Sequence, residues 1–348
     1  MLGNHKSPRI GLTLASTLFA ILFFCSFVFI KGADQPSDKG KTLQTVRTQN
    51  GLVSGVKTPT PGVEAFKGIP YAAPPVGNLR WRAPRPHQNW DGVLKADHFC
   101  QNCMQATQSQ QANPPHTQRK SVWAKPYLIP KGPLSENCLY LNIWTAAKSS
   151  SEHRPVIVWI HGGGFQSGSG SVPVYNGEAM AKKGVVFVTI NYRLGLFGFL
   201  ALPELTRESG HDASGNYGLL DQIAALKWVK ENIEAFGGNP GNVTIDGQSA
   251  GAFSINYLVA SPLAKELFQR AIAESGAGFV PNPMNTTPDL KTAEANGLKF
   301  MKKAHTSSLA ELRKIPADSL QKIGGSFWPV IDGYVLPEPI EKIFSEGK

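Results

Sequence analysis

Ser249 lies in a sequence context that suits a nucleophile. Residues 247–251 read Gly-Gln-Ser-Ala-Gly; they follow a short strand-like stretch, 243–246, and lead into the apolar residues 252–255. A serine hydroxyl attacks a carbonyl only where it stands clear of the backbone, which requires a sharp strand-to-helix turn with glycines two residues to either side. Such a turn places the amide of Ala250 at a helix N-terminus, where it favours a developing oxyanion. The pattern predicts a nucleophile elbow.

A second glycine run supports this interpretation. Residues 161–165, His-Gly-Gly-Gly-Phe, follow the apolar run 156–160, Val-Ile-Val-Trp-Ile. This arrangement is expected of a loop whose backbone amides complete an oxyanion hole, and glycine is needed because the backbone itself must approach the substrate oxygen. The alternative is a phosphate-binding loop. That loop would require a Lys-Ser/Thr pair or G-x-G-x-x-G spacing, and the run has neither.

Predicted strands and helices alternate along the chain, and these elements must position the two motifs. The continuous apolar runs 156–160 and 185–190 are typical of parallel strands buried on both faces. Helical spacing of apolar residues predicts a helix over 216–236. The alternation predicts an α/β fold with a mostly parallel sheet. The other expectations are strands at 139–144, 243–246 and 271–276, helices at 177–183, 250–260, 290–305 and 309–314, a loop or short strand at 327–336, and a hairpin of 45–49 and 52–56 around Asn50-Gly51.

Composition limits the chain to one large globular domain or at most two. Of its 348 residues, 41% are hydrophobic and 17% charged, which argues against disorder. The formal net charge is +10, but the basic residues are scattered and no nucleic-acid-binding motif is present. We therefore expect a solvated basic surface and no nucleic-acid partner.

The N-terminus reads as an export signal. Lys6 and Arg9 precede an uncharged run, 10–30, that is long enough to span a bilayer. Cleavage after Ala33 fits a signal peptide, but Lys31 stands where a small residue is preferred, so an uncleaved membrane anchor stays open. Either way we expect the domain outside the cytoplasm, secreted or periplasmic, or held at the membrane by this segment.

Three of the four cysteines lie outside the export segment. Cys100 and Cys103 form a C-x-x-C pair, but no second pair or histidine cluster follows, which disfavours a metal site. In an oxidising compartment a disulfide is the better interpretation. Together with Cys138 these residues allow one bridge and one remaining thiol, and the residues alone do not select the pair.

The motifs together resemble the type B carboxylesterases, which include the cholinesterases, within the α/β-hydrolase fold. The resemblance extends from about residue 46 to the last residue. It implies a carboxylesterase domain at 43–348, after a signal peptide or anchor at 1–33 and a linker at 34–42. The segments that carry it are 66–71 (Phe-Lys-Gly-Ile-Pro-Tyr), 79–82 (Leu-Arg-Trp-Arg), 135–142 (Ser-Glu-Asn-Cys-Leu-Tyr-Leu-Asn), 161–165, 191–193 (Asn-Tyr-Arg), 215–222 (Gly-Asn-Tyr-Gly-Leu-Leu-Asp-Gln), 247–251 and 274–276 (Glu-Ser-Gly).

The resemblance also implies roles for individual residues. Ser249 is expected to be the nucleophile, with the amides of Gly163, Gly164 and Ala250 forming the oxyanion hole. His161 is expected to be a structural loop histidine, because the base of this family lies elsewhere. The substrate would be a small-molecule carboxylic ester, and no metal or organic cofactor is needed.

Two further pairs follow from the resemblance. Cys103 and Cys138 are expected to form a disulfide that closes a loop over the active-site gorge, which leaves Cys100 free. Arg80 and Glu136 are expected to form a buried ion pair. The alternative for the second pair is an exposed contact that contributes little to stability.

Three departures from the family pattern matter. Gln248 stands where many members carry Glu, and Asn137 replaces the usual Asp before the cysteine. The acid and the histidine of the family's triad follow the Ile-Asp-Gly segment 331–333, whereas this chain ends at Lys348. His305, the only histidine after Ser249, falls on an expected peripheral helix and is a poor substitute. We therefore expect a fragment, incomplete at its C-terminus.

Two functions from different classes remain. The first is a serine carboxylesterase acting through an acyl-enzyme, inactive or weakly active as this chain because triad members act as a unit. The second is a non-catalytic extracellular binding or adhesion protein on the same fold. Because the serine and both glycine runs are intact, the sequence favours the esterase.

Overall fold

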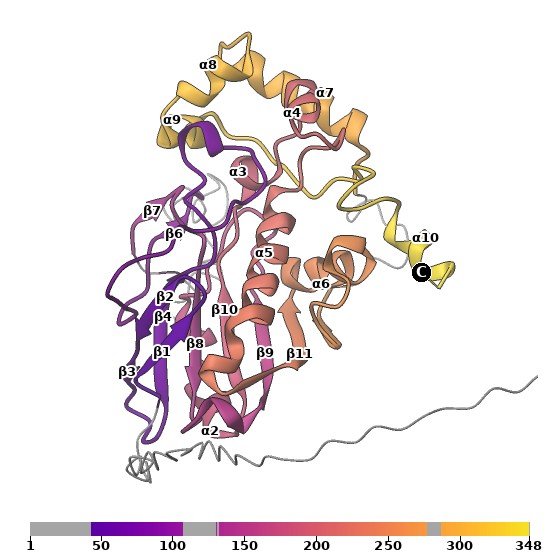
Figure 1. Ribbon diagram of the computed structural model, residues 1–348. Coiled ribbons are helices and arrows are strands. Elements are labelled where there is room, and N and C mark those ends of the chain that lie inside the picture. Colours follow the sequence, from indigo (N-terminus) through magenta and orange to yellow (C-terminus); the bar gives the residue numbers. More distant parts are fainter. Residues whose placement is uncertain (1–42, 107–129, 131, 277–286, 348) are drawn as a thin grey trace, which may run out of the picture. The chain divides into compact units, whose positions relative to one another are not determined.

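The computed structural model describes residues 43–106, 130, 132–276 and 287–347 (Figure 1). The predicted export segment, 1–33, and the predicted linker, 34–42, lie outside the described residues. The chain divides into two units, Met1–Lys39 and Gly40–Lys348, and the description below concerns the second. In the part of the chain that the structure describes, no helix is both long and apolar enough to cross a membrane.

A seven-stranded sheet forms the centre of the fold, in the order β12-β11-β9-β10-β8-β4-β3. The strands β10, β9, β11 and β12 pair in parallel, as the alternating pattern predicts. The other three pair antiparallel, so the sheet is mixed, and the α/β class is confirmed. The strands are β3 (Val56–Lys57), β4 (Glu64–Pro70), β8 (Tyr140–Thr145), β9 (Arg154–Ile160), β10 (Val186–Ile190), β11 (Gly238–Gln248) and β12 (Arg270–Glu274).

Helices flank this sheet and gather beyond one of its ends. Figure 1 shows α7, α8 and α9 at the end of the sheet where β11 terminates. The predicted helices α7 and α8 are confirmed, whereas α3, α4, α9 and α10 were not predicted. The helices are α2 (Glu178–Lys182), α3 (Gly195–Phe199), α4 (Pro203–Glu208), α5 (Tyr217–Asn232), α6 (Ala250–Ala260), α7 (Leu290–Lys303), α8 (Leu309–Lys314), α9 (Ala317–Ile323) and α10 (Ile340–Ser345).

The two faces of the sheet are covered differently. On the helix-packed face, alternate residues of β9 and β11, such as Val158 and Ile245, join one large core with α5 and α6. On the other face α2 packs over β8 and β10, where Ala181 meets Trp144 and Phe187. Towards β12 this second face becomes exposed, and we name this part the open face. Its residues, none of them buried, are Ile157, Trp159, Thr244, Asp246, Gln248, Arg270, Ile272 and Glu274.

The helix α5 confirms the helix that the spacing of apolar residues predicted. Leu219, Ile223, Leu226 and Val229 recur at helical spacing and are all buried in the core. The last predicted turn tightens into a 3₁₀ turn, Ile233–Phe236, and Gly237 ends it with a φ of 79°. A left-handed conformation at this point is the usual role of glycine after a helix.

The N-terminal hairpin is confirmed, but its turn lies one residue earlier than predicted. Strands β1 (Thr45–Thr48) and β2 (Gly51–Ser54) pair from Thr48 to Gly51, so Gln49 and Asn50 form the turn. Gly51 is the first residue of β2, and the Trp90 indole covers it: a Cβ on Gly51 would lie 2.5 Å from Trp90 Nε1. A third strand, β5 (Val93–Lys95), completes this small sheet, and β6 (Asn102–Cys103) pairs with β7 (Leu134–Ser135).

Candidate active site

Ser249 stands between β11 and α6 in a strained conformation. Its φ is 57° and its ψ is −121°, values that a residue with a side chain rarely adopts. Its N–H donates to the Glu274 carbonyl of β12 over 2.9 Å, and its carbonyl accepts the N–H of Phe253 over 3.0 Å. These two hydrogen bonds fix the turn from both sides and leave the side chain partly exposed.

The glycines around Ser249 allow backbone to pack on backbone. A Cβ on Gly251 would lie 2.1 Å from the Ile160 carbonyl oxygen, and one on Gly247 would lie 2.7 Å from the carbonyl carbon of Gly251. Real Cβ atoms do not approach other heavy atoms this closely. The elbow therefore sits directly against the end of β9, from which the glycine loop departs.

The glycine loop lies beside the nucleophile. A Cβ on Gly162 would be 2.5 Å from the Gln248 carbonyl oxygen and 3.2 Å from Ser249 Cβ. Gly163 and Gly164 follow with φ of 115° and 62°, conformations that favour glycine. Ala250 is the first residue of α6, so its amide follows Ser249 directly, while Gly163 and Gly164 follow the glycine that packs against Ser249.

A segment distant in sequence anchors the glycine loop, and the sequence did not predict this contact. Gln166 Nε2 donates to the Phe327 carbonyl oxygen over 2.6 Å. The buried ring of Phe165 contacts the Trp328 ring edge-on, with centroids 5.8 Å apart. Trp328 is 44% exposed, so it presents an aromatic surface next to the glycine loop. No local pattern could have linked positions so far apart in the chain.

His161 supports the loop from behind. Its buried ring stacks on Tyr192 with centroids 4.5 Å apart, and its Nδ1 lies 2.8 Å from the Gly162 carbonyl oxygen. Burial lowers the pKa of His161 to about 4, so the ring is neutral at physiological pH and donates the Nδ1 hydrogen to that carbonyl. This geometry matches the structural role that the resemblance implied.

No base reaches Ser249 within the residues that the structure describes, where no side chain hydrogen-bonds to its hydroxyl. His305 is exposed and follows α7 with a φ of 52°. Asp332, in the segment after which the family's acid was expected, accepts the N–H groups of residues 334–336. Burial raises the pKa of Asp332, and its hydrogen bonds serve this turn.

Asp246 is an unexpected titratable group three residues before the serine. It is half-buried on the open face, and burial together with the nearby Glu274 carboxylate raises its pKa to about 6. Its Oδ1 is shielded from solvent and has no hydrogen-bond partner in the described part of the chain. Trp159 on β9 is the register partner of Asp246, and its indole N–H is also shielded from solvent without a partner among the described residues.

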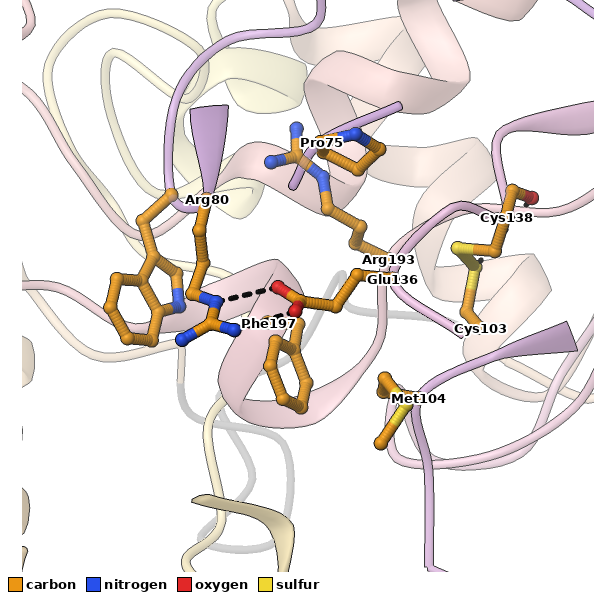
Figure 2. Close-up of a pocket in the computed structure, with 9 residues that line it drawn as sticks. Pro75, Arg80, Cys103, Met104, Glu136, Cys138, Arg193 and Phe197 are labelled. Atoms are coloured by element: carbon orange, nitrogen blue, oxygen red, sulfur yellow. Dashed lines mark hydrogen bonds and ion pairs between the residues drawn. A yellow bond between two sulfur atoms is a disulfide. The ribbon is translucent and has the colours of Figure 1, made fainter. Parts of the chain in front are cut away.

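The predicted partners Arg80 and Glu136 meet in a bidentate ion pair (Figure 2). Arg80 Nε and Nη2 each donate over 2.6 Å to one oxygen of Glu136. The side chains are only 7% and 12% exposed. Arg80 Nη1 also donates to the carbonyl oxygens of Arg313 and Ile315, so this guanidinium ties three segments together.

A disulfide and Arg193 line a small cavity together with Arg80 and Glu136 (Figure 2). The sulfurs of Cys103 and Cys138 are bonded, and Cys100 is a half-buried free thiol. Arg193 binds Asp221 through Nε and Nη2, both over 2.7 Å, whereas its Nη1 has no partner among the described residues. Ser249 and the glycine loop do not line this cavity.

A metal centre is not evident in the described ranges, which contain no group of three or more His, Cys, Asp or Glu side chains placed to hold an ion. A serine on a strained strand-to-helix turn, on a mixed sheet between helices, defines the class of α/β-hydrolases. Residues 42–348 match the model of the carboxylesterase family, and the chain belongs to that family.

Known relatives agree with this assignment. The chain is 39% identical to fumonisin B1 esterase of Sphingopyxis macrogoltabida, over 99% of this chain and 62% of that protein. It is 42% identical to para-nitrobenzyl esterase of Bacillus subtilis, over 88% and 60%. The solved carboxylesterase EST55 of Geobacillus stearothermophilus at pH 6.8 is 40% identical, with a TM-score of 0.74 over 87% and 60%. The chain thus spans about 60% of the length of these relatives.

Proposed function

We propose that Ser249 is the nucleophile of a carboxylic ester hydrolase. The observation that carries the proposal is the packing of Gly162 against Ser249, which sets the glycine loop beside a serine in a strained turn. Ser249 Oγ loses its proton to a base and bonds to the ester carbonyl carbon, while the amides of Gly163, Gly164 and Ala250 hold the oxyanion. The alcohol leaves with a proton, and water then hydrolyses the acyl-enzyme.

The histidine base and its acid come from polypeptide other than the described residues. No described side chain hydrogen-bonds to the Ser249 hydroxyl, and loss of one triad member removes most of the rate advantage. Residues 1–348 alone therefore hydrolyse esters weakly or not at all. Robust turnover by this chain alone would contradict that part of the proposal.

The substrate is a small-molecule carboxylic ester, and the reaction needs no metal or organic cofactor. Two similar proteins are named for ester substrates, fumonisin B1 and a para-nitrobenzyl ester, which supports the class of reaction without fixing the acyl or alcohol group. Nucleic acid is not a partner. We propose that the protein is secreted or periplasmic, or anchored outside the cytoplasm by its N-terminal segment.

Covalent labelling tests the nucleophile. Native protein is treated with a fluorophosphonate, the intact mass of the labelled species is measured, and the modified residue is mapped. We expect the label on Ser249 and its loss in Ser249→Ala. The matched control is Ser261→Ala, because the Ser261 hydroxyl is buried without a hydrogen-bond partner among the described residues and its removal should change little.

The intact mass separates the remaining possibilities. A labelled species well above 37.6 kDa supports an esterase in which this chain is joined to further polypeptide. A labelled species at or just below that mass means that the triad is completed within these residues or by a partner. Folded protein that takes no label has an unactivated Ser249, and this favours the alternative of an extracellular binding protein.

A further inference from the structure

The buried side chain of Gln105 binds the residues that follow the glycine loop. Its Nε2 donates to the Gly168 carbonyl oxygen over 2.9 Å, and its Oε1 accepts the Gly168 N–H over 2.9 Å. The second Nε2 hydrogen goes to the Cys103 carbonyl oxygen over 3.1 Å. One side chain, only 5% exposed, therefore satisfies both backbone groups of Gly168.

Gly168 lies directly against the glycine loop. A Cβ on Gly168 would be 2.3 Å from His161 Nδ1 and 2.6 Å from the Gly162 carbonyl oxygen. Backbone packs on backbone at this point, so a shift of Gly168 would displace Gly162. Gly162 in turn packs against Ser249. The hydrogen bonds of Gln105 thus lie two backbone contacts away from the proposed nucleophile.

A tight turn connects the glycine loop to Gly168. The Gly163 carbonyl oxygen accepts the N–H groups of Gln166 and Ser167 over 3.0 and 3.1 Å. The N–H groups of Gly163 and Gly164 donate to none of the residues that the structure describes, so both are available to a ligand oxygen. The direction in which they point depends on how this turn is held.

The segment that carries Gln105 is itself fixed. A disulfide bonds Cys103 to Cys138, and strand β6 pairs with β7. Asn191 Nδ2 also donates to the Gln101 carbonyl oxygen over 3.2 Å. Because its own backbone is held, Gln105 can restrain the glycine loop instead of moving with it.

We propose that Gln105 is a positioning residue for the ester hydrolysis proposed above, on which this inference rests. Its two hydrogen bonds to Gly168 hold the glycine loop so that the N–H groups of Gly163 and Gly164 face the developing oxyanion. Such donors act only from the right position, and a displacement of about 1 Å can lower the rate about 100-fold. Gln105 acts through the loop and does not touch the substrate.

The rate of fluorophosphonate labelling in the intact native protein tests the proposal. Gln105→Met keeps the shape of the side chain and removes its hydrogen bonds. At saturating probe the rate constant for labelling Ser249 should fall at least about 10-fold, and the probe concentration at half-maximal rate should change less than about 3-fold. Unfolded protein lowers the amount of label but not this rate constant, so the measurement separates positioning from a loss of stability.

Thr145→Val is the matched control, because it also removes hydrogen bonds of a buried side chain. The Thr145 hydroxyl donates to the Phe236 carbonyl oxygen and accepts the Ala147 N–H, both over 3.0 Å. Thr145 ends β8, which runs antiparallel to β10, so it lies at the end of the sheet opposite to Ser249. This variant should label within about 2-fold of the parent rate. Equally slow labelling of both variants would overturn the proposal.

Gln105→Glu provides a second variant of nearly the same shape. The ionised carboxylate accepts the Gly168 N–H but has no hydrogen for the Gly168 carbonyl oxygen, whereas the protonated form has one. The labelling rate constant, divided by that of the parent at the same pH, should rise at least about 3-fold between pH 8 and pH 5.5. His161, which packs against Gly168, stays neutral over this range because its pKa is about 4. A ratio that does not change with pH contradicts the role of these hydrogen bonds.

Amide hydrogen exchange tests the contact itself. The Gly168 N–H should exchange at least about 10-fold faster in Gln105→Met than in the parent protein. A parent protein that takes no label contradicts the proposed function and the positioning role with it. A labelled parent with an equally reactive Gln105→Met variant contradicts the positioning role alone.

Discussion

Two carboxylates, Asp221 and Asp246, stand in opposite surroundings on the two sides of the sheet. Asp221 of α5 is fully buried and accepts the backbone N–H of Arg193 over 3.0 Å and two guanidinium N–H groups over 2.7 Å each. Asp246 of β11 is half-buried, and its Oδ1 has no partner among the described residues. The chain itself provides hydrogen-bond donors to both oxygens of the first carboxylate, whereas one oxygen of the second has no partner among the described residues.

The same contrast extends to the whole of the two faces. On the helix-packed face, apolar side chains of β9 and β11 are fully buried beneath α5 and α6, and the elbow packs backbone to backbone. None of the residues that define the open face is buried, although parallel strands are usually covered on both sides. The helix-packed face should therefore carry most of the stability of this chain, and four substitutions test that difference.

The largest expected effect is at Asp221. Asp221→Asn leaves the Arg193 guanidinium buried, only 3% exposed, without its counter-charge. Breaking a buried ion pair by removing one partner lowers the free energy of unfolding by about 3–5 kcal/mol. Urea unfolding followed by tryptophan fluorescence measures the change. A loss below about 1 kcal/mol would mean that the pair behaves like a surface ion pair.

The next effect concerns the close contact under the elbow. Gly251→Ala adds a Cβ 2.1 Å from the Ile160 carbonyl oxygen, and the backbone can yield only by moving β9. We expect a loss of about 3 kcal/mol in the free energy of unfolding. Gly241→Ala is the control, since its Cβ would meet only the Asn239 side chain, at 3.2 Å. If both variants lost the same free energy of unfolding, the close contact at the elbow would not be the cause of the loss.

A smaller effect of opposite sign is expected at Asp246. Its folded pKa of about 6 lies above the ordinary value of 3.8, so the charged form is disfavoured in the fold. The destabilisation is absent below pH 3.8, grows between pH 3.8 and 6, and is complete above pH 6. Asp246→Asn should therefore raise the free energy of unfolding at pH 8 by about 1 kcal/mol, a figure discounted for solvent screening because the group is half-exposed.

The pH dependence separates this effect from a general change in packing. At pH 3.5 the variant and the parent protein should unfold at the same urea concentration. A stabilisation that is equal at pH 3.5 and pH 8 would not come from the charge. A destabilised variant at pH 8 would mean that the carboxylate has a partner in the intact protein.

The smallest effect is expected at Ile272. Ile272→Ala should change the free energy of unfolding in dilute solution by less than about 0.5 kcal/mol, because the side chain is already exposed. Ile245→Ala, on the neighbouring strand, should cost about 2–5 kcal/mol because Ile245 is fully buried. If both variants lost several kcal/mol in the free energy of unfolding, the open face would be packed in solution. The two faces of the sheet would then not differ in burial.

Local patterns predicted most of the fold. The strand-to-helix turn at Ser249, the helix α5 and the parallel strands β9 to β11 follow from residue types within short windows, so their approximate positions could be predicted from the sequence. The antiparallel direction of β8 was not accessible, because strand direction depends on the route of the connecting chain. The hairpin turn was misplaced by one residue, and the contact of Gly51 with Trp90, which is remote in sequence, could not be predicted from the hairpin segment.

The site was predictable only in its local part. The resemblance pointed to Ser249 and the glycine loop, and the fold places them together. The anchor from Gln166 to Phe327 joins segments 161 residues apart, and no local signal marks it. Asp246 did carry a signal that the sequence analysis did not use: an aspartate in the middle of a short strand is out of place if both faces of that strand are buried.

The three-way contact of Arg80 has a consequence for how the protein is made. Its partner Glu136 lies 56 residues later, but the carbonyls of Arg313 and Ile315 lie 233 and 235 residues later. A ribosome that adds about 5–20 residues per second reaches Ile315 roughly 10 to 50 s after Arg80. Throughout that interval the newly made N-terminal segment lacks its final contacts, so it is open to chaperones and to proteases.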